Sequence, residues 1–173
     1  MIFRSVTVCL SLWLGLCAAG HAADRTAGHV PAPSQSIQGT VYPSACAPEQ
    51  QRALRQALAG AHPCDEQAAW TLVETALCAP ADAATSSYLD AHVPRRIEQI
   101  DSDLDVESKS VLRKDRALLA TLVTAGQAWD ASLDASTEGM TLQYYWNEAC
   151  IRWLTFEYAK GKWMLRQLRS ACD

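Results

Sequence analysis

The first 22 residues decide the compartment in which this chain folds, and therefore whether its cysteines can form disulfides. A short basic start ending at Arg4 precedes an apolar run of eleven residues from Val6 to Leu16, and small residues follow up to Ala22. This is the three-part layout of a secretory signal peptide. The apolar run is shorter than the roughly 17 to 25 residues that a membrane span needs, and no later stretch reaches that length. We therefore expect an exported chain, in the periplasm or secreted, with no membrane span after cleavage.

The expected domain organisation follows from this cleavage. Residues 1–22 are the signal peptide, 23–43 are a flexible arm with many prolines and little periodicity, and 44–173 form a single helical domain. Cleavage removes one of the 15 basic residues and none of the 19 acidic ones, so the mature chain carries a net charge of −5. A weakly acidic protein is a poor candidate for binding nucleic acid and suits a basic protein partner.

Five cysteines remain after cleavage, at positions 46, 64, 78, 150 and 172. Exported compartments oxidise thiols, so we expect most of these to pair. The odd number leaves one cysteine unpaired within the chain, bonded to another chain, or bound to a ligand.

Two short helices are predicted in the first half of the domain. One begins near Pro48 and ends at Gly60, and the other is capped by Asp65 and stops before Pro80. In an antiparallel helical hairpin the start of the first helix meets the end of the second, so Cys46 and Cys78 are the preferred pair. Cys64 would then lie at the opposite end of the hairpin, where it could bond to Cys150 or Cys172.

Three further helical segments complete the expected fold. One starts beyond Pro94, a second covers about residues 107–135 and a third about 141–169, where Gly161 is the place at which it could break. An unbroken last helix would hold Cys150 and Cys172 too far apart to bond. No segment alternates cleanly enough to predict a strand. The sequence therefore predicts an all-α fold, a small disulfide-stabilised bundle of four to five helices.

Motifs that carry catalysis are absent from the sequence. There is no Gly-x-Ser-x-Gly stretch and no phosphate-binding glycine motif, and the His62-Pro63-Cys64 sequence has no companion that would complete a metal site. A run of alternating acids, Asp101, Asp103 and Asp105, resembles the start of a calcium loop, but Val106 stands where that loop needs glycine. We therefore expect no enzyme activity, no metal and no cofactor, and we interpret the acidic run as a solvated segment that could steer a cationic partner.

Seven of the eleven aromatic residues of the mature chain lie between Tyr144 and Trp163. On a helix, one apolar side would hold most of them, while Tyr144, Ile151 and Tyr158, spaced by seven, would share the opposite side. A helix that is apolar on both sides is either buried centrally or offers one side to a partner. These three residues, with the acidic run, are the candidate binding residues.

Two stretches resemble the LprI-like lysozyme-inhibitor domain family. The segment from Ala125 to Ala135 is similar to its "AQ-x-AW-x-x-x-RDA" core, and Cys150 to Thr155, followed by Arg166 to Leu168, is similar to its closing "C-x-x-x-LT-x-x-R-x-x-x-L" stretch. The resemblance covers about residues 110–168. It implies a helical periplasmic domain, and some members of the family inhibit lysozyme.

Together these features predict an exported binding protein of the cell envelope. The expected function is to inhibit, or give immunity to, a peptidoglycan-cleaving enzyme, with a basic peptidoglycan hydrolase as the partner. The alternative is a structural or envelope-assembly interaction module without inhibitory activity.

Overall fold

The computed structural model describes residues 35–37, 40–103 and 106–173, with side chains from residue 42 onward. The predicted signal peptide and most of the predicted arm lie outside these residues. The described elements follow in the order β1 (Gln35–Ile37), β2 (Thr40–Tyr42), α1 (Pro48–Ala61), α2 (Glu66–Cys78), α3 (Ala83–His92), β3 (Arg96–Asp103), β4 (Val106–Arg113), α4 (Arg116–Thr121), β5 (Trp129–Ala135), β6 (Gly139–Asn147), β7 (Cys150–Ala159) and β8 (Lys162–Cys172).

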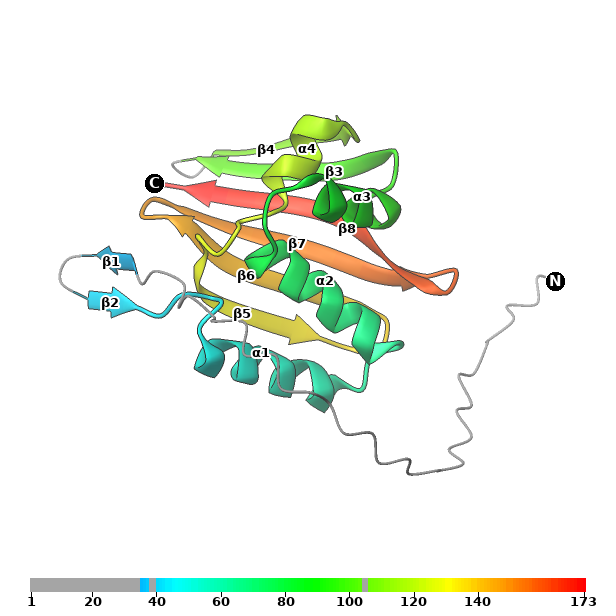
Figure 1. Ribbon diagram of the computed structural model, residues 1–173. Coiled ribbons are helices and arrows are strands. Elements are labelled where there is room, and N and C mark those ends of the chain that lie inside the picture. The colour runs from blue at the N-terminus through cyan, green and yellow to red at the C-terminus, as the bar shows by residue number, and fades with distance from the viewer. Residues whose placement is uncertain (1–34, 38–39, 104–105) are drawn as a thin grey trace, which may run out of the picture. The chain divides into compact units, whose positions relative to one another are not determined.

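A six-stranded sheet forms the centre of the described fold (Figure 1). Its strand order is β4-β3-β8-β7-β6-β5, and among these pairs β3 with β8 is parallel while the others are antiparallel. The strands β1 and β2 form a separate two-stranded ribbon within the segment expected to be an unstructured arm. Consecutive hairpins from β5 to β8 therefore bring the last strand of the chain to the middle of the sheet.

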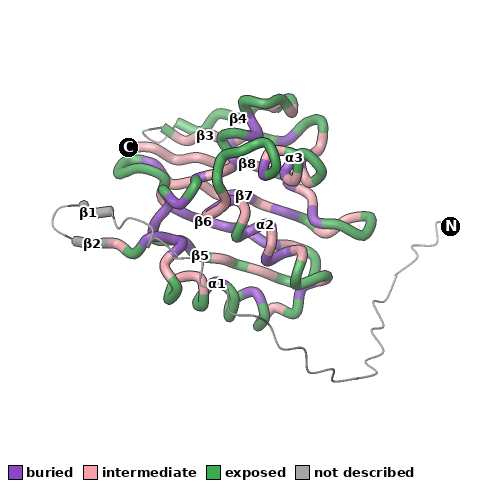
Figure 2. The backbone as a smooth tube through the Cα atoms, viewed as in Figure 1, coloured by how far each residue is buried: buried purple, intermediate pink, exposed green. Residues whose placement is uncertain are grey.

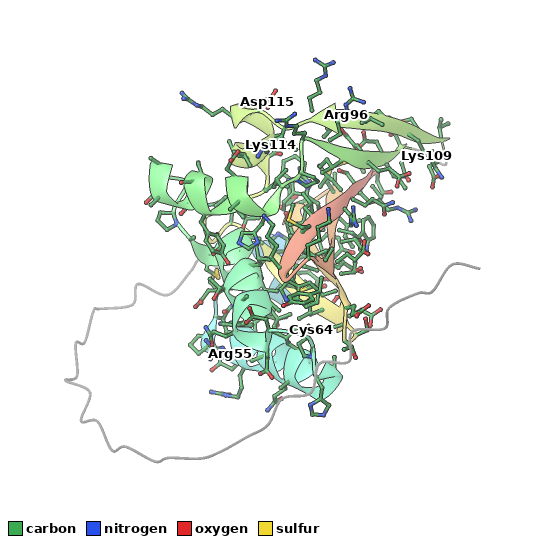
Figure 3. All side chains as sticks on the ribbon, turned by 90° about the vertical axis from the view of Figure 1, so that its right-hand side faces the viewer. Arg55, Cys64, Arg96, Lys109, Lys114 and Asp115 are labelled. Carbon is green, nitrogen blue, oxygen red and sulfur yellow. A yellow bond between two sulfur atoms is a disulfide. The ribbon has the colours of Figure 1, made fainter. Side chains whose placement is uncertain are left out.

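Helices α1, α2 and α3 lie on one side of this sheet, as the view turned by 90° shows (Figure 3). The core lies between the two layers, and the buried residues of the strands alternate with half-buried or exposed ones (Figure 2). Trp163 is fully buried there, and its indole N–H donates to the carbonyl of Cys64 at 2.9 Å. This bond ties the loop between α1 and α2 to the central strand β8.

The predicted all-α fold is wrong. Only the hairpin of α1 and α2 is confirmed as helical: the segment beyond Pro94 is β3, residues 107–135 hold β4, α4 and β5, and residues 141–169 hold β6, β7 and most of β8. The apolar residues of these segments fit a helical period closely enough to mislead. The chain instead breaks at short turns, and strands such as β6 bury every second side chain against the helices.

Two disulfides are present, Cys46–Cys78 and Cys150–Cys172. The first joins Cys46, two residues before α1, to the last residue of α2. The second joins two cysteines that are directly paired on β7 and β8, because the chain folds back at Gly161. Only an unbroken last helix would keep Cys150 and Cys172 apart, and the chain turns back at Gly161, the place where a break was expected. Cys64 belongs to neither disulfide. Two disulfides are compatible with folding in an oxidising compartment outside the cytoplasm.

The helices α3 and α4 each begin at an aspartate that caps them. The Asp82 carboxylate accepts from the backbone N–H of Thr85 at 2.8 Å, and Asp115 accepts from that of Leu118 at 2.8 Å. The bond from Thr85 lowers the pKa of Asp82 below its usual value. None of the helices in the described part of the chain is long and apolar enough to cross a membrane.

Candidate functional site: the open face of the sheet

None of the described helices lies on one face of the sheet, and we call this face the open face. On β6 the residues Met140, Leu142 and Tyr144 point to the helices and are buried, so the residues between them point to the open face. The register of the strands extends this alternation across the whole sheet. Ile100 and Trp129 are also buried, yet they do not belong to the core between sheet and helices.

The strand register places six open-face residues in one row across all six strands. We call this the middle row, and from β4 to β5 it contains Lys109, Ile100, Arg169, Trp153, Gln143 and Ser132. The guanidinium of Arg169 lies 5.4 Å from the centroid of the Trp153 ring, and the indole N–H of Trp153 donates to Oε1 of Gln143 at 2.8 Å. These contacts hold the Trp153 ring between a cation and an amide.

Arg169 also faces a carboxylate at the edge of the sheet. Its Nη2 lies 3.7 Å from Oε2 of Glu107 on β4, and Glu107 in turn lies 3.5 Å from Nζ of Lys109. The Nε of Arg169 is buried and makes no hydrogen bond to any described residue. The middle row thus has a fixed aromatic centre beside a partly satisfied guanidinium.

An aromatic stack borders the middle row at the β5 edge. The ring of Trp129 stacks on Tyr145 with centroids 4.7 Å apart, and Tyr42 packs against Trp129 with centroids 4.8 Å apart. Tyr145 pairs across the strands with Ile151, which also lies on the open face. The half-buried Tyr145, Ile151 and Trp153 therefore form one apolar area on the open face.

These residue types are those on which protein interfaces depend. Trp, Tyr and Arg are enriched among the residues that dominate binding energy, and interface centres are depleted in other charged residues. An aromatic ring that is already held by its neighbours loses little side-chain entropy on binding. The open face can therefore bind a protein surface.

The predicted binding stripe does not form one surface. Tyr144 is fully buried in the core, Tyr158 packs edge-on against Trp163 with centroids 5.4 Å apart on the same side, and Ile151 points to the open face. A spacing of seven keeps residues together on a helix. These three residues instead lie on strands, where an odd spacing and the turn between β6 and β7 separate them.

Tyr144 has an unusual environment. Its hydroxyl is buried and makes no hydrogen bond of acceptable geometry, although the guanidinium of Arg152 on the paired strand lies nearby. Burial raises the pKa of Tyr144 above its ordinary value of 10.0, and the charge of Arg152 opposes this rise. Arg152 itself is held by a bond from Nη1 to the carbonyl of Thr121 and by the ring of Trp146, 4.7 Å away. Tyr144 is therefore a core residue with an unsatisfied polar atom.

The acidic run lies at the hairpin between β3 and β4. Asp101 is half-buried and its carboxylate accepts from the side-chain amide of Gln99, Asp103 is exposed, and Asp105 lies outside the described residues. The structure does not bring Asp101 or Asp103 next to the middle row, because Asp101 and Asp103 point to the opposite side of β3 from Ile100.

The described residues contain no group of three or more His, Cys, Asp or Glu that could hold a metal ion. His62 ends α1 in a left-handed conformation and is exposed, whereas His92 donates from Nδ1 to the carbonyl of Trp163 at 2.8 Å. A groove of about 430 Å³ between α1 and α2 contains one acidic side chain, Glu66, and no histidine, cysteine, serine or threonine. The guanidinium of Arg55 lies 4.4 Å from the centroid of the Trp70 ring, so the Arg55 side chain covers the aromatic ring that lines this groove.

Sequence reasoning missed Trp153, Gln143 and Arg169. The signal that could have found them is the hairpin turn at Lys160-Gly161, both with positive φ, after a run rich in aromatic and β-branched residues. A two-residue turn that requires positive φ at both positions is typical of a β-hairpin.

A comparison with protein-family models finds no match, and a comparison with the sequences of curated proteins finds none. Among solved structures, an NTF-2 like protein of unknown function from Silicibacter pomeroyi is 14% identical, with a TM-score of 0.39, covering 62% of this chain and 94% of that one. A protein of unknown function with a cystatin-like fold from Nostoc punctiforme is 12% identical, with a TM-score of 0.36, covering 63% of this chain and 91% of that one.

Proposed function

We propose that this protein is an exported binding protein, not an enzyme, and that its open face docks onto a basic peptidoglycan-cleaving enzyme and blocks it. The observation that supports the proposal is the middle row. Trp153 is held between Arg169 and Gln143 on a sheet face that no described helix covers. Such a preorganised aromatic anchor beside an arginine is typical of the residues that dominate a protein interface.

The charge of the chain favours a basic partner. The mature protein carries a net charge of −5, and long-range attraction to a cationic protein would speed association without any specific contact. Enzymes that cleave peptidoglycan share the exported compartment expected for this chain. The apolar area of Tyr145, Ile151 and Trp153 would supply the desolvated centre of the interface.

The alternative function is that of an envelope-assembly module, which would use the same docking surface without inhibiting its partner. Both functions require Trp153 for binding, and they differ in what binding does to the partner. An assay must therefore measure binding and enzyme activity separately.

The test uses the mature protein and a purified basic muramidase. We expect the protein to bind the immobilised muramidase and to slow its clearance of a peptidoglycan suspension. Trp153→Ala should weaken binding by about 2 kcal/mol, or about 30-fold, because it removes the central anchor. The expected salt dependence is a slower association at high ionic strength.

Trp146→Ala is the matched control, because Trp146 is 41% exposed but lies beside Arg152 rather than on the open face. It should leave binding and inhibition unchanged. Binding without inhibition would favour the assembly module. If Trp153→Ala binds as tightly as the wild type, or if ultracentrifugation shows that the open face is covered by a second copy, the proposed docking surface is refuted.

A further inference from the structure

Four basic side chains gather at the end of the ribbon formed by β3 and β4. Arg96 and Arg113 are direct cross-strand partners at the last register position, and beyond them the backbone N–H of Lys114 donates to the carbonyl of Arg95 at 3.0 Å. These four residues line a hollow of about 300 Å³, which we call the basic pocket. Figure 3 shows Arg96 and Lys114 at the same end of the molecule, far from Arg55 on α1.

Most of the charge in the basic pocket is unopposed. Lys114 is paired, since its Nζ lies 2.9 Å from Oδ1 of Asp90 and donates to the Asp90 carbonyl at 3.0 Å. The side chains of Arg95, Arg96 and Arg113 make no ion pair or hydrogen bond to any residue that the structure describes.

The nearest acids along the chain are engaged elsewhere. The carboxylate of Asp115 caps α4, and that of Glu98 accepts from the side-chain amide of Gln167 at 2.9 Å. Neither is paired with an arginine of the basic pocket. Three exposed arginines therefore line the basic pocket beside one neutralised ammonium, and none of the three is paired with an acid that the structure describes.

This arrangement costs stability. Like charges directly opposite each other in an antiparallel pair are destabilising, and Arg96 faces Arg113 in this way. The cost is notable in a chain whose net charge is negative, where most positions could hold an acid or a neutral residue. A local arrangement that opposes the stability of the fold marks a functional position more often than an ordinary one.

We propose that the basic pocket binds a phosphoryl group. A phosphate carries more charge and more acceptor oxygens than a carboxylate, so it satisfies more of the N–H donors that three planar guanidinium groups offer. The hollow is larger than a single anion, so the rest of a phosphate ester can extend from it. In the expected compartment the phosphoryl group can belong to free phosphate or to the headgroup of an anionic lipid, and the chemistry of recognition is the same.

The experiment compares the wild type with Arg96→Gln/Arg113→Gln. Thermal unfolding of the mature protein is followed while inorganic phosphate is titrated against sodium chloride of equal ionic strength. Phosphate should raise the Tm of the wild type in a saturable manner, and chloride should not. The double variant should have a higher Tm than the wild type without phosphate, because the repulsion is gone, and its affinity for phosphate should fall at least about tenfold.

Arg52→Gln on α1 is the matched control, since it removes the same charge from an exposed position at the other end of the sheet. It should respond to phosphate as the wild type does. Arg95→Gln serves as a second variant that leaves the cross-strand pair intact, and it should also weaken the phosphate effect.

The source of the phosphoryl group is tested with vesicles. Co-sedimentation with vesicles of phosphatidylglycerol and phosphatidylcholine, but not of phosphatidylcholine alone, with competition by free phosphate, would assign the headgroup. A phosphate-dependent Tm without vesicle binding would assign the free anion. If neither probe acts on the wild type, or if the double variant responds to both as strongly as the wild type, the basic pocket is not a phosphoryl site.

Discussion

Truncating Tyr144 tests whether this side chain is a core residue or a binding residue. It is 0% exposed on the helix side of β6, among the residues that fill the space between the sheet and the helices. Tyr144→Ala would leave a cavity the size of an aromatic ring, and such truncations cost about 3 to 5 kcal/mol. Domains of this size are stable by only about 5 to 15 kcal/mol, so the loss is a large fraction of the total.

Tyr144→Phe separates the ring from the hydroxyl. Because the hydroxyl is buried without a hydrogen bond, its removal relieves an unsatisfied polar atom and gives up only its electrostatic interaction with the nearby guanidinium of Arg152. We expect Tyr144→Phe to be neutral or to stabilise the fold by up to about 1 kcal/mol. The ring would remain in place, so the core packing would not change.

Urea denaturation followed by far-ultraviolet circular dichroism, with the disulfides intact, measures both variants. Ile151→Ala on the open face is the comparison, and it should cost clearly less than Tyr144→Ala. A Tyr144→Ala variant with wild-type stability would refute the placement of this residue in the core. A loss of more than about 1 kcal/mol in Tyr144→Phe would show that the hydroxyl makes a hydrogen bond.

Three further predictions concern pH and the disulfide. Burial raises the pKa of Tyr144 above 10.0 in the folded state, so its contribution to stability is complete below about pH 10 and is lost as the pH rises further. Tyr144→Phe should flatten this alkaline loss of stability in denaturation curves at pH 8 to 11. An unchanged slope would contradict the raised pKa of Tyr144. Replacing Cys46 and Cys78 by alanine removes a disulfide that spans 32 residues, which should lower the free energy of unfolding by roughly 3 to 4 kcal/mol in denaturant titrations. A loss near zero would show that this disulfide does not constrain the unfolded chain. The pKa of Asp82 is lowered by the backbone N–H of Thr85, so the cap stabilises α3 above the ordinary carboxyl pKa and is lost as the pH falls. Asp82→Ala should therefore lower the Tm at neutral pH and converge with the wild type in acid, and a difference that persists in acid would contradict the cap.

The hairpin of α1 and α2 could be predicted from the sequence because its signals are local, whereas the sequence did not predict α3 and β3, which follow it. Pro48 begins α1, Asp65 caps α2, and the apolar residues of both helices follow a helical period. The antiparallel hairpin brings Cys46 close to Cys78, and this proximity depends only on two short helices and a tight loop between them.

The second half could not be predicted because helical and strand periods coincide at a spacing of four. Leu142 and Trp146, or Cys150 and Leu154, share a side in either structure. Spacings of two and of three residues distinguish a strand from a helix. In these segments, alanines and half-buried polar residues stand at such positions and make the apolar pattern ambiguous. Two local signals indicate where the expected helices are interrupted. One is the turn at Lys160-Gly161, where both residues have positive φ, and the other is Asp115, which caps the start of α4.

The sequence by itself determined the acidic net charge, the helical hairpin and the absence of recognisable catalytic motifs, and it predicts an export signal. Only the tertiary structure decided which face each aromatic residue occupies. Tyr144 and Trp153 are both aromatic, and the sequence does not distinguish their environments. Strand pairing buries Tyr144 under the helices and holds Trp153 on the open face between Arg169 and Gln143. The pairing of Arg96 with Arg113 likewise arises from the register of β3 and β4, which is a contact between residues 17 positions apart that no local pattern encodes.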